Sequence, residues 1–253
     1  MKNTLATIAA LAVLTTSTIA SAQSSIYFED NFDGEDLAAE WEVSNPNPDG
    51  YLVEDGVLIM LAQDGTPANY AQAENILRLN KPVPKGDWTM TARFQFTPQS
   101  MGEMVRIGVA KDEKNSMLAS MNLESYNYAL TNVWADAEKL SRGKATSFRR
   151  FVYKIESRDL EQRASQFRDN IQGVQLRLEK KGRKYTTALR FESTNPGAEG
   201  SVSEEWFTVQ QLTSLRAPGD AFTLVFSSNS NTYTPGGGEG LVEVDWVKVE
   251  VNE

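Results

Sequence analysis

Apolar and polar residues alternate with a period of two along much of this 253-residue chain. The clearest stretch is 88–96, whose apolar positions are Trp88, Met90, Ala92, Phe94 and Phe96. Shorter stretches of this kind recur at 105–110, 117–123, 174–179, 185–192 and 241–249, and the apolar runs 57–61 and 221–227 are also expected to be strands. A period of two is typical of strands with one face on the core, so we predict an all-β chain with the strand spacing of a sandwich.

The two ends and the turns make this prediction more specific. Val242 to Val249 alternates and is rich in valine, which predicts a half-buried final strand. A final strand must pair with something already folded, and a jelly roll pairs its two ends, so we expect residues 28–34 beside 241–249. Asp55-Gly56 and Lys181-Gly182-Arg183-Lys184 predict two hairpin turns.

The first 22 residues have the pattern of a secretory signal peptide. Lys2 precedes a short apolar run at 8–19, and Ala20-Ser21-Ala22 supplies the small residues of a cleavage site. We therefore expect cleavage after Ala22, a secreted or periplasmic protein, and a single domain over residues 23–253. No other segment has 18 consecutive apolar residues, so no membrane span is expected.

The segment from 135 to 170 is less regular, and we predict an insertion there instead of core strands. Leu160, Ala164 and Phe167 have helical spacing, and Ser157 could cap the start of that helix. Between Trp134 and Arg190 the chain has 15 Lys and Arg against 7 Asp and Glu, although its total net charge is −9. The basic segment is interpreted either as a partner-binding face or as an ordinary solvated surface.

Several motifs, in this order, resemble the C-terminal sandwich domain of family 43 β-xylosidases. They are Phe28 to Gly34 with Trp41, the loop 47–51, the turn 56–58, the segment 83–88, the hairpin 174–185 and the ending 244–249. The ending also resembles the last strand of family 16 glucanases. The resemblance covers roughly residues 28–250 and implies a concanavalin A-like jelly-roll β-sandwich.

The absence of certain residue types excludes several chemistries. The chain has no Cys, so the fold uses no disulfide, and it has no His, so a Ser-His-Asp triad and a His-ligated zinc site are both impossible. Any metal would need oxygen ligands, which points to calcium. In related lectin-like sandwiches an acid near the start and an Asp in the last strand hold such an ion. The resemblance therefore implies Asp30 and Asp245 as its ligands.

Catalysis is not favoured by the motifs. The family 16 enzymes carry a Glu-x-Asp-x-x-Glu strand, which we do not find, and Glu243, Asp245 and Glu250 do not share one face. A polysaccharide lyase of this fold would use a Tyr and an Arg, for which Tyr126, Tyr128, Tyr153 and Arg106 are available. A glycoside hydrolase or a lyase stays open as an alternative.

A carbohydrate-binding face fits the composition better, because sugars dock on exposed aromatic rings while polar groups fix their hydroxyls. Trp88 alternates with core residues and is assigned to the core, and Trp41 and Trp246 are assigned structural roles from the resemblance. The predicted ligand-binding residues are Trp134, Tyr126, Tyr128, Arg106 and Arg149. Further basic residues beside Trp134 (Arg142, Lys144 and Arg150) could favour an acidic polysaccharide.

We therefore predict a monomeric, lectin-like protein that binds polysaccharide. A non-catalytic interaction protein of the envelope is the remaining alternative. Nucleic acid is not expected as a partner, because the chain is predicted to be exported and its total charge is acidic.

Overall fold

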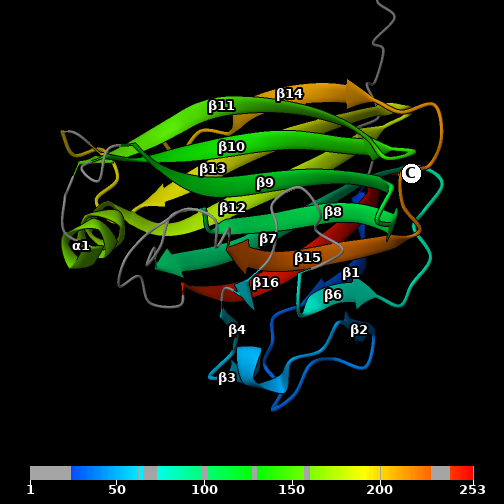
Figure 1. Ribbon diagram of the computed structural model, residues 1–253, viewed down its shortest axis with the longest axis horizontal. Coiled ribbons are helices and arrows are strands. Elements are labelled where there is room, and N and C mark those ends of the chain that lie inside the picture. Colours follow the sequence, from blue (N-terminus) through cyan, green and yellow to red (C-terminus); the bar gives the residue numbers. More distant parts are fainter. Residues whose placement is uncertain are drawn as a thin grey trace, which may run out of the picture.

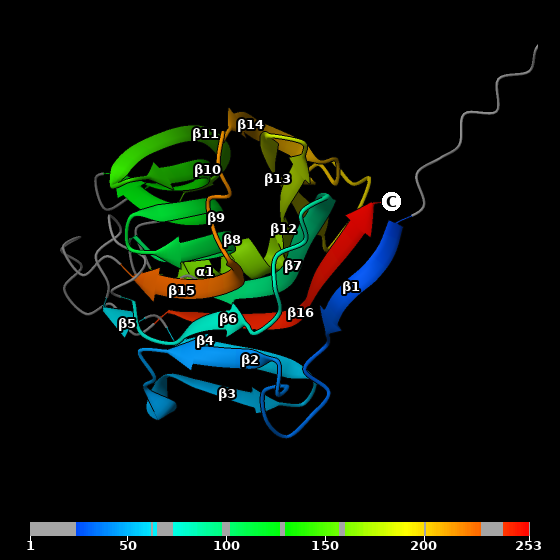
Figure 2. The ribbon, with the colours of Figure 1, turned by 90° about the vertical axis from the view of Figure 1, so that its right-hand side faces the viewer.

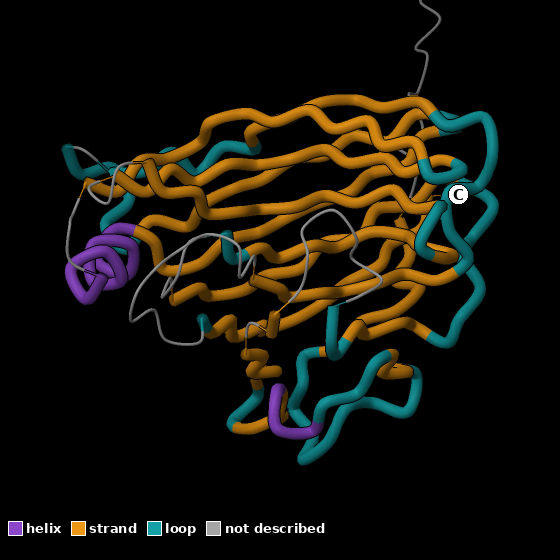
Figure 3. The backbone as a smooth tube through the Cα atoms, in the orientation of Figure 1, coloured by secondary structure: helices purple, strands orange, loops and turns teal. Residues whose placement is uncertain are grey.

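The computed structural model describes residues 24–61, 63–64, 73–97, 102–126, 130–156, 160–199, 201–228 and 240–252. Two layers of antiparallel strands face each other across an apolar interior (Figures 1 and 2). Figure 3 shows how little of the described chain is helical. The predicted signal peptide and its cleavage site lie outside the described residues. No helix in the described ranges is long and apolar enough to cross a membrane.

We call the two layers sheet A and sheet B, and each has eight strands among the described residues. In spatial order, sheet A runs β14 (Phe207–Thr213), β13 (Lys184–Ser193), β12 (Ile171–Lys181), β7 (Asp87–Thr97), β16 (Leu241–Asn252), β4 (Val57–Leu61) and β3 (Tyr51–Glu54), with β1 (Ser24–Asp30) also on β16. Sheet B runs β11 (Lys144–Glu156), β10 (Leu130–Ser141), β9 (Asn115–Tyr126), β8 (Met104–Asp112), β15 (Ala221–Ser228), β6 (Ile76–Leu79) and β2 (Trp41–Ser44), with β5 (Gln63–Asp64) on β15. A short 3-10 helix, η1 (Pro48–Gly50), precedes β3, and α1 (Leu160–Asn170) closes one end of the sandwich (Figure 1).

The core forms where the inward residues of the two sheets meet. The apolar positions of β7 are all buried, as their alternation predicts, and Trp88 has no exposed surface. Its ring meets Phe222 of β15 edge-on at 5.0 Å, and Phe96 meets Phe226 at 5.7 Å. These aromatic pairs join sheet A to sheet B, and Phe167 of α1 extends the cluster by packing 6.2 Å from Phe96.

The two ends pair as the sequence predicts. β1 lies antiparallel to β16, with Phe28 opposite Val249 and Asp30 opposite Val247 (Figure 2). The turn at Asp55-Gly56 joins β3 to β4, and both of its residues have positive φ, as a tight hairpin turn requires. The second predicted hairpin joins β12 to β13 at Gly182.

The segment predicted to be irregular contains two long strands. Residues 135–156 contribute most of β10 and β11, which form a hairpin at the edge of sheet B with Val133, Ala135 and Ala137 buried. Only the next part follows the prediction, because α1 begins at Leu160 and packs Phe167 on the core. Ser157, the predicted helix cap, lies outside the described residues.

Candidate functional site

Three of the predicted ligand-binding residues lie on the face of sheet B that points away from sheet A. Val105 and Ile107 face the core, so Arg106 between them points outward. Trp134 and Arg149 occupy outward positions of β10 and β11 by the same alternation. We call this surface the sheet B face and define it by Arg106, Asn122, Trp134, Asp136, Glu138, Arg149 and Phe151.

Strand register aligns these side chains in rows across the sheet. Arg106 of β8 is opposite Ser120 of β9, Ser120 is opposite Asp136 of β10, and Asp136 is opposite Arg149 of β11. Arg106 and Ser120 are buried even though they point away from the core between the sheets. The row is therefore a second, polar interior on the outer side of sheet B.

Asp136 is the most deeply buried charge of this face, with none of its surface exposed. The Arg149 guanidinium holds it through two bonds, from Nε to Oδ1 at 2.9 Å and from Nη2 to Oδ2 at 3.0 Å. Asn122 donates a further bond from Nδ2 to Oδ2 at 2.5 Å. A bidentate guanidinium fixes both the position and the orientation of the carboxylate.

Arg106 forms the second ion pair of the face. Its Nε lies 3.3 Å from Oε2 of Glu138, and its Nη1 donates to the Ser227 hydroxyl at 3.1 Å. Only 1% of the Arg106 side chain is exposed, against 26% for Glu138. Two positive and two negative side chains therefore pair within the face, and their charges balance.

Trp134 is half-buried and borders these ion pairs. Phe151 meets its ring edge-on at 5.8 Å, and the Arg149 guanidinium lies 5.7 Å from the ring centre. The indole N–H is buried and has no hydrogen-bond partner among the described residues. Phe151 leaves 47% of its surface exposed, so an accessible aromatic ring lies beside the row of polar side chains.

The sequence interpretation missed four members of this face: Asn122, Asp136, Glu138 and Phe151. The alternation Trp134-x-Asp136-x-Glu138 was visible as a signal, because it puts an aromatic ring and two carboxylates on one side of a strand. This alternation was missed because residues 135–170 were assigned to an insertion and not to strands.

The predicted tyrosines are not all brought together with Arg106. Tyr126 is the last residue of β9, paired with Leu130, and Tyr128 lies outside the described residues. Tyr153 packs against Phe191 at 6.0 Å on the opposite side of the hairpin, and burial raises its pKa. Tyr153 is therefore no acid or base partner for Arg106.

The basic segment does not form one patch. Its described residues divide among β10 and β11 of sheet B, α1, and β12 and β13 of sheet A. Arg150 donates to the carbonyl of Thr208 at 2.9 Å and lies over the Phe207 ring, whereas Lys180 donates to the carbonyl of Gly86 at 2.6 Å. These cations bind carbonyls and rings at strand edges, and this placement gives no support to an acidic ligand.

The two residues expected to hold calcium have other partners. Asp30 accepts hydrogen bonds from the Phe32 amide at 2.9 Å and from the Trp41 indole at 2.7 Å. Asp245 lies 2.5 Å from Nη1 of Arg93. In the described part of the chain, no group of three or more acidic side chains could hold a metal ion. The residues present do not fit a calcium site, which needs six to eight oxygen ligands.

Arg93 instead links two carboxylates on the outer side of sheet A. Glu192 accepts bonds from Arg93 at 2.8 Å and from Gln175 at 2.6 Å. Burial alone would raise the pKa of Glu192, but these hydrogen bonds outweigh burial and lower it. Burial raises the pKa of Asp245, and the charge of Arg93 offsets only part of that shift.

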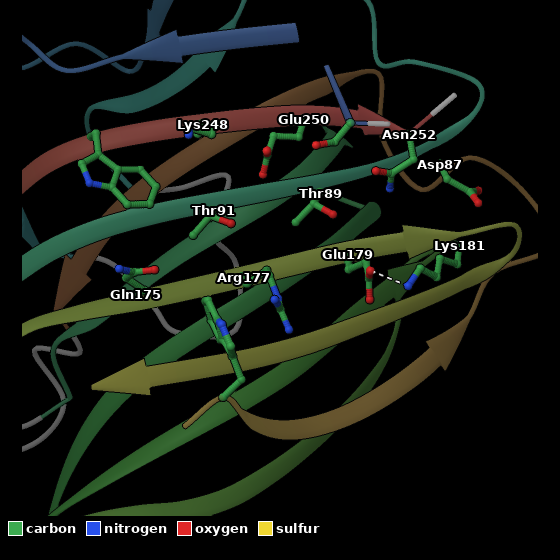
Figure 4. A pocket seen from close by; sticks show the side chains of 13 residues that line it. Asp87, Thr89, Thr91, Gln175, Arg177, Glu179, Lys181, Lys248, Glu250 and Asn252 are labelled. Carbon is green, nitrogen blue, oxygen red and sulfur yellow. Dashed lines mark ion pairs between the residues drawn. The ribbon is translucent and has the colours of Figure 1, made fainter. Parts of the chain in front are cut away.

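Two tryptophans that were assigned structural roles are placed differently. Trp41 is 8% exposed and packs edge-on against Phe28 at 5.3 Å, in keeping with its assignment. Trp246 is half-buried and lines a hollow on the outer side of sheet A, and ten of the other side chains that line it are labelled in Figure 4. Trp246 therefore reaches the surface of sheet A, and its structural role stays a prediction.

Comparisons with solved structures identify the fold. The GH43 protein BlXynB from Bacillus licheniformis matches over 89% of this chain and 39% of its own, with 13% identity and a TM-score of 0.59. The CBM2 module of the evolved Dit of Lactobacillus casei BL23 phage J-1 matches over 92% of this chain and 98% of its own, with 11% identity and a TM-score of 0.57. A β-1,3-glucanase from Mycobacterium marinum matches over 89% of this chain and 98% of its own, with 17% identity and a TM-score of 0.51.

The first of these similarities concerns only part of the matched protein, because this chain spans 39% of the length of BlXynB. No protein-family model matches the sequence, and no curated protein matches it. At these identities the comparisons show the fold alone. The chain has a concanavalin A-like β-sandwich fold, similar to the sandwich domain of GH43 proteins.

Proposed function

We propose that this protein binds polysaccharide on the sheet B face without cleaving it. The observation that carries the proposal is the convergence of Trp134, Arg106 and Arg149, from three different strands, on one outward face. Sugar-binding sites combine an aromatic platform with polar groups held in fixed positions. Trp134 and Phe151 supply the platform, and the two ion pairs hold the polar groups.

The charge of the face favours a neutral polysaccharide over an acidic one. Each of the two arginines already faces a carboxylate, at 2.9 Å for Arg149 and 3.3 Å for Arg106. An acidic sugar would have to compete with Asp136 and Glu138 for these guanidinium groups. A neutral sugar needs only hydroxyl contacts with the members of these pairs that reach solvent, which are Arg149 and Glu138, with 36% and 26% of their side chains exposed.

Hydrolysis is the second candidate, because Asp136 and Glu138 lie two residues apart on the same side of β10. That spacing puts their Cα atoms about 7 Å apart, close to the range that separates the two carboxyls of inverting hydrolases. One of the two must deliver a proton to the sugar oxygen. Both carboxylates are bound by arginine, and Asp136 has no exposed surface, so binding is the better-supported function.

The test is glycan binding by the protein and by matched variants of β10 and β11. Affinity electrophoresis and calorimetry on xylan, β-1,3-glucan and polygalacturonate should show binding to a neutral chain, weakened at least tenfold by Trp134→Ala and by Phe151→Ala. Phe148→Ala is the matched control, because Phe148 is equally exposed, at 44% against 47%, but lies on the opposite side of the same strand.

Other outcomes would overturn the proposal. They are no binding to any glycan, binding that Trp134→Ala leaves unchanged, or release of reducing sugar that Glu138→Gln abolishes. We also propose export with cleavage after Ala22. N-terminal sequencing of the exported protein should then begin at Gln23, and any other start contradicts that cleavage site.

A further inference from the structure

The outer side of sheet A, on the opposite side of the sandwich, carries a groove of about 550 Å³. Its floor consists of side chains from three neighbouring strands: Gln175, Arg177 and Glu179 from β12, Thr89 and Thr91 from β7, and Lys248 and Glu250 from β16 (Figure 4). The volume is in the range of ligand sites, roughly 300 to 1,000 Å³. We call this hollow the sheet A groove.

Two tryptophans stand on either side of this floor. Trp206 lies over the Arg177 guanidinium of β12 at 3.9 Å, and Arg190 lies 5.1 Å from the same ring. Trp246 projects from β16, and β7 runs between β12 and β16. The strands β12 and β16 are two strand spacings apart, roughly 10 Å, and the rings stand over Arg177 of β12 and on β16. That separation exceeds the width of one sugar ring, so an occupant that touches both must be a chain of linked rings.

Arg177 is the polar group best placed to fix such an occupant. It makes no ion pair with a described residue, and its Nε is buried without a hydrogen-bond partner. The Trp206 ring covers the guanidinium carbon at 3.9 Å, and the N–H groups of the side chain are available as donors to an occupant. Thr91, directly opposite Arg177 on β7, adds a hydroxyl beside them.

The charges of the groove identify the chemical class of the occupant. The lining has three cations, Arg177, Lys181 and Lys248, and three anions, Asp87, Glu179 and Glu250. Lys181 and Glu179 pair with each other at 2.8 Å, and Lys248 lies 3.7 Å from Glu29. A balanced, hydroxyl-rich surface with two aromatic rings fits an uncharged polyhydroxylated chain better than a polyanion or an apolar peptide.

We propose that the sheet A groove is a second, independent binding site for a neutral oligosaccharide of at least two linked sugars. Sugar rings stack on Trp206 and Trp246, and their hydroxyls bind Arg177 and the threonines of β7. With one site on each outer face, a single molecule could hold two polysaccharide chains.

The test measures binding of xylan, β-1,3-glucan and polygalacturonate fragments by calorimetry in a background that lacks the other site. In Trp134→Ala, we expect residual binding to neutral fragments, weakened at least tenfold by adding Trp246→Ala. Thr89→Tyr is the second variant, because tyrosine suits a strand and fills the groove from its floor. Leu52→Ala is the control, since Leu52 is an exposed apolar residue of sheet A outside the groove.

Failure of this inference is distinguishable from failure of the proposed function. If Trp134→Ala removes all binding and the groove variants bind normally, the sheet B face stands and the sheet A groove is refuted. If the groove variants remove all binding and Trp134→Ala has no effect, the sheet A groove stands and the sheet B face is refuted. Residual binding in Trp134→Ala that is confined to polygalacturonate would overturn the neutral class proposed for the groove.

Discussion

Asp136 and Arg149 form an ion pair whose two partners differ sharply in burial. Asp136 has no exposed surface, whereas the Arg149 side chain leaves 36% of its surface in solvent. The two charges therefore have different alternatives when the pair is broken. A freed Arg149 can turn toward water, but a freed Asp136 stays below the surface of the sheet B face.

The asymmetry predicts unequal effects of two substitutions on stability. Arg149→Met removes the guanidinium from a buried carboxylate and should lower the free energy of unfolding by about 3 kcal/mol. Asp136→Asn keeps the shape of the side chain and leaves a charge that can be hydrated, so it should cost about 1 kcal/mol. Urea unfolding of both variants, with Arg142→Met at the exposed turn as control, measures the difference. Equal costs would contradict the burial argument.

The two carboxylates that share Arg93 should respond to pH in opposite directions. The pKa of Glu192 is lowered from 4.5, so its stabilising effect is present above about pH 4.5 and is lost as the pH falls through the lowered value. The pKa of Asp245 is raised from 3.8, so its contribution favours folding below pH 3.8 and is lost as the pH rises through the raised value.

Two isosteric variants test these signs. At pH 7, Glu192→Gln should lower the free energy of unfolding by about 1 kcal/mol, and this loss should shrink as the pH falls below 4.5. Asp245→Asn should cost less at pH 7 than Glu192→Gln, because burial already disfavours the charge it removes. Urea unfolding between pH 3 and pH 7 compares them. A larger cost for Asp245→Asn at pH 7 would show that Arg93 dominates burial at that site.

Strands whose inward residues are large could be predicted from the sequence, and those lined by small residues could not. In β7 the inward positions include Trp88 and Phe94, so the period of two stands out. In β10 the inward positions include Ala135 and Ala137, whereas the outward positions carry Asp136 and Glu138. In the sequence alone, these two charged residues are typical of a solvated loop. Only the structure shows that Arg149 and Arg106, on other strands, pair with them.

The sheet A groove was hidden by one irregularity in the final strand. Val242 and Val244 face the core, and unbroken alternation would turn Trp246 inward after them. A bulge between Val244 and Trp246 shifts the alternation, so that Val247 and Val249 face the core and Trp246 faces outward. The spacing of three from Val244 to Val247 was the only trace of this bulge in the sequence.

Tyr185 should make the protein sensitive to alkali. Its ring is 4% exposed and packs edge-on against Trp88 at 6.0 Å, and burial raises its pKa from 10.0 to about 12. The neutral phenol favours folding, and this effect is complete below pH 10 and is lost as the pH rises from 10 to 12. Each unit of this pKa difference corresponds to about 1.4 kcal/mol of unfolding free energy.

Tyr185→Phe should therefore remove part of the alkaline destabilisation. Unfolding free energies of the variant should fall less steeply than those of the unsubstituted protein between pH 10 and pH 12. Tyr51→Phe, on the outer strand β3, is the control for general effects of removing a phenol. Identical alkaline slopes for Tyr185→Phe and the unsubstituted protein would contradict a buried phenol at this position.

Gly108 should tolerate no side chain, because neighbouring backbone fills the space where one would start. It lies in the middle of β8 with φ at 152°, and an added Cβ would lie 2.2 Å from the Met117 carbonyl oxygen and 3.0 Å from the Leu118 Cα. Both atoms belong to β9, which sheet B holds on either side, so they cannot move away as a flexible side chain would. Gly108→Ala should therefore cost about 3 kcal/mol of unfolding free energy. Gly86→Ala is the matched control, because no atom lies within 4 Å of its added Cβ, and it should change stability by less than about 0.5 kcal/mol. If the two variants unfold at the same urea concentration, β8 and β9 are not packed as closely as this geometry requires.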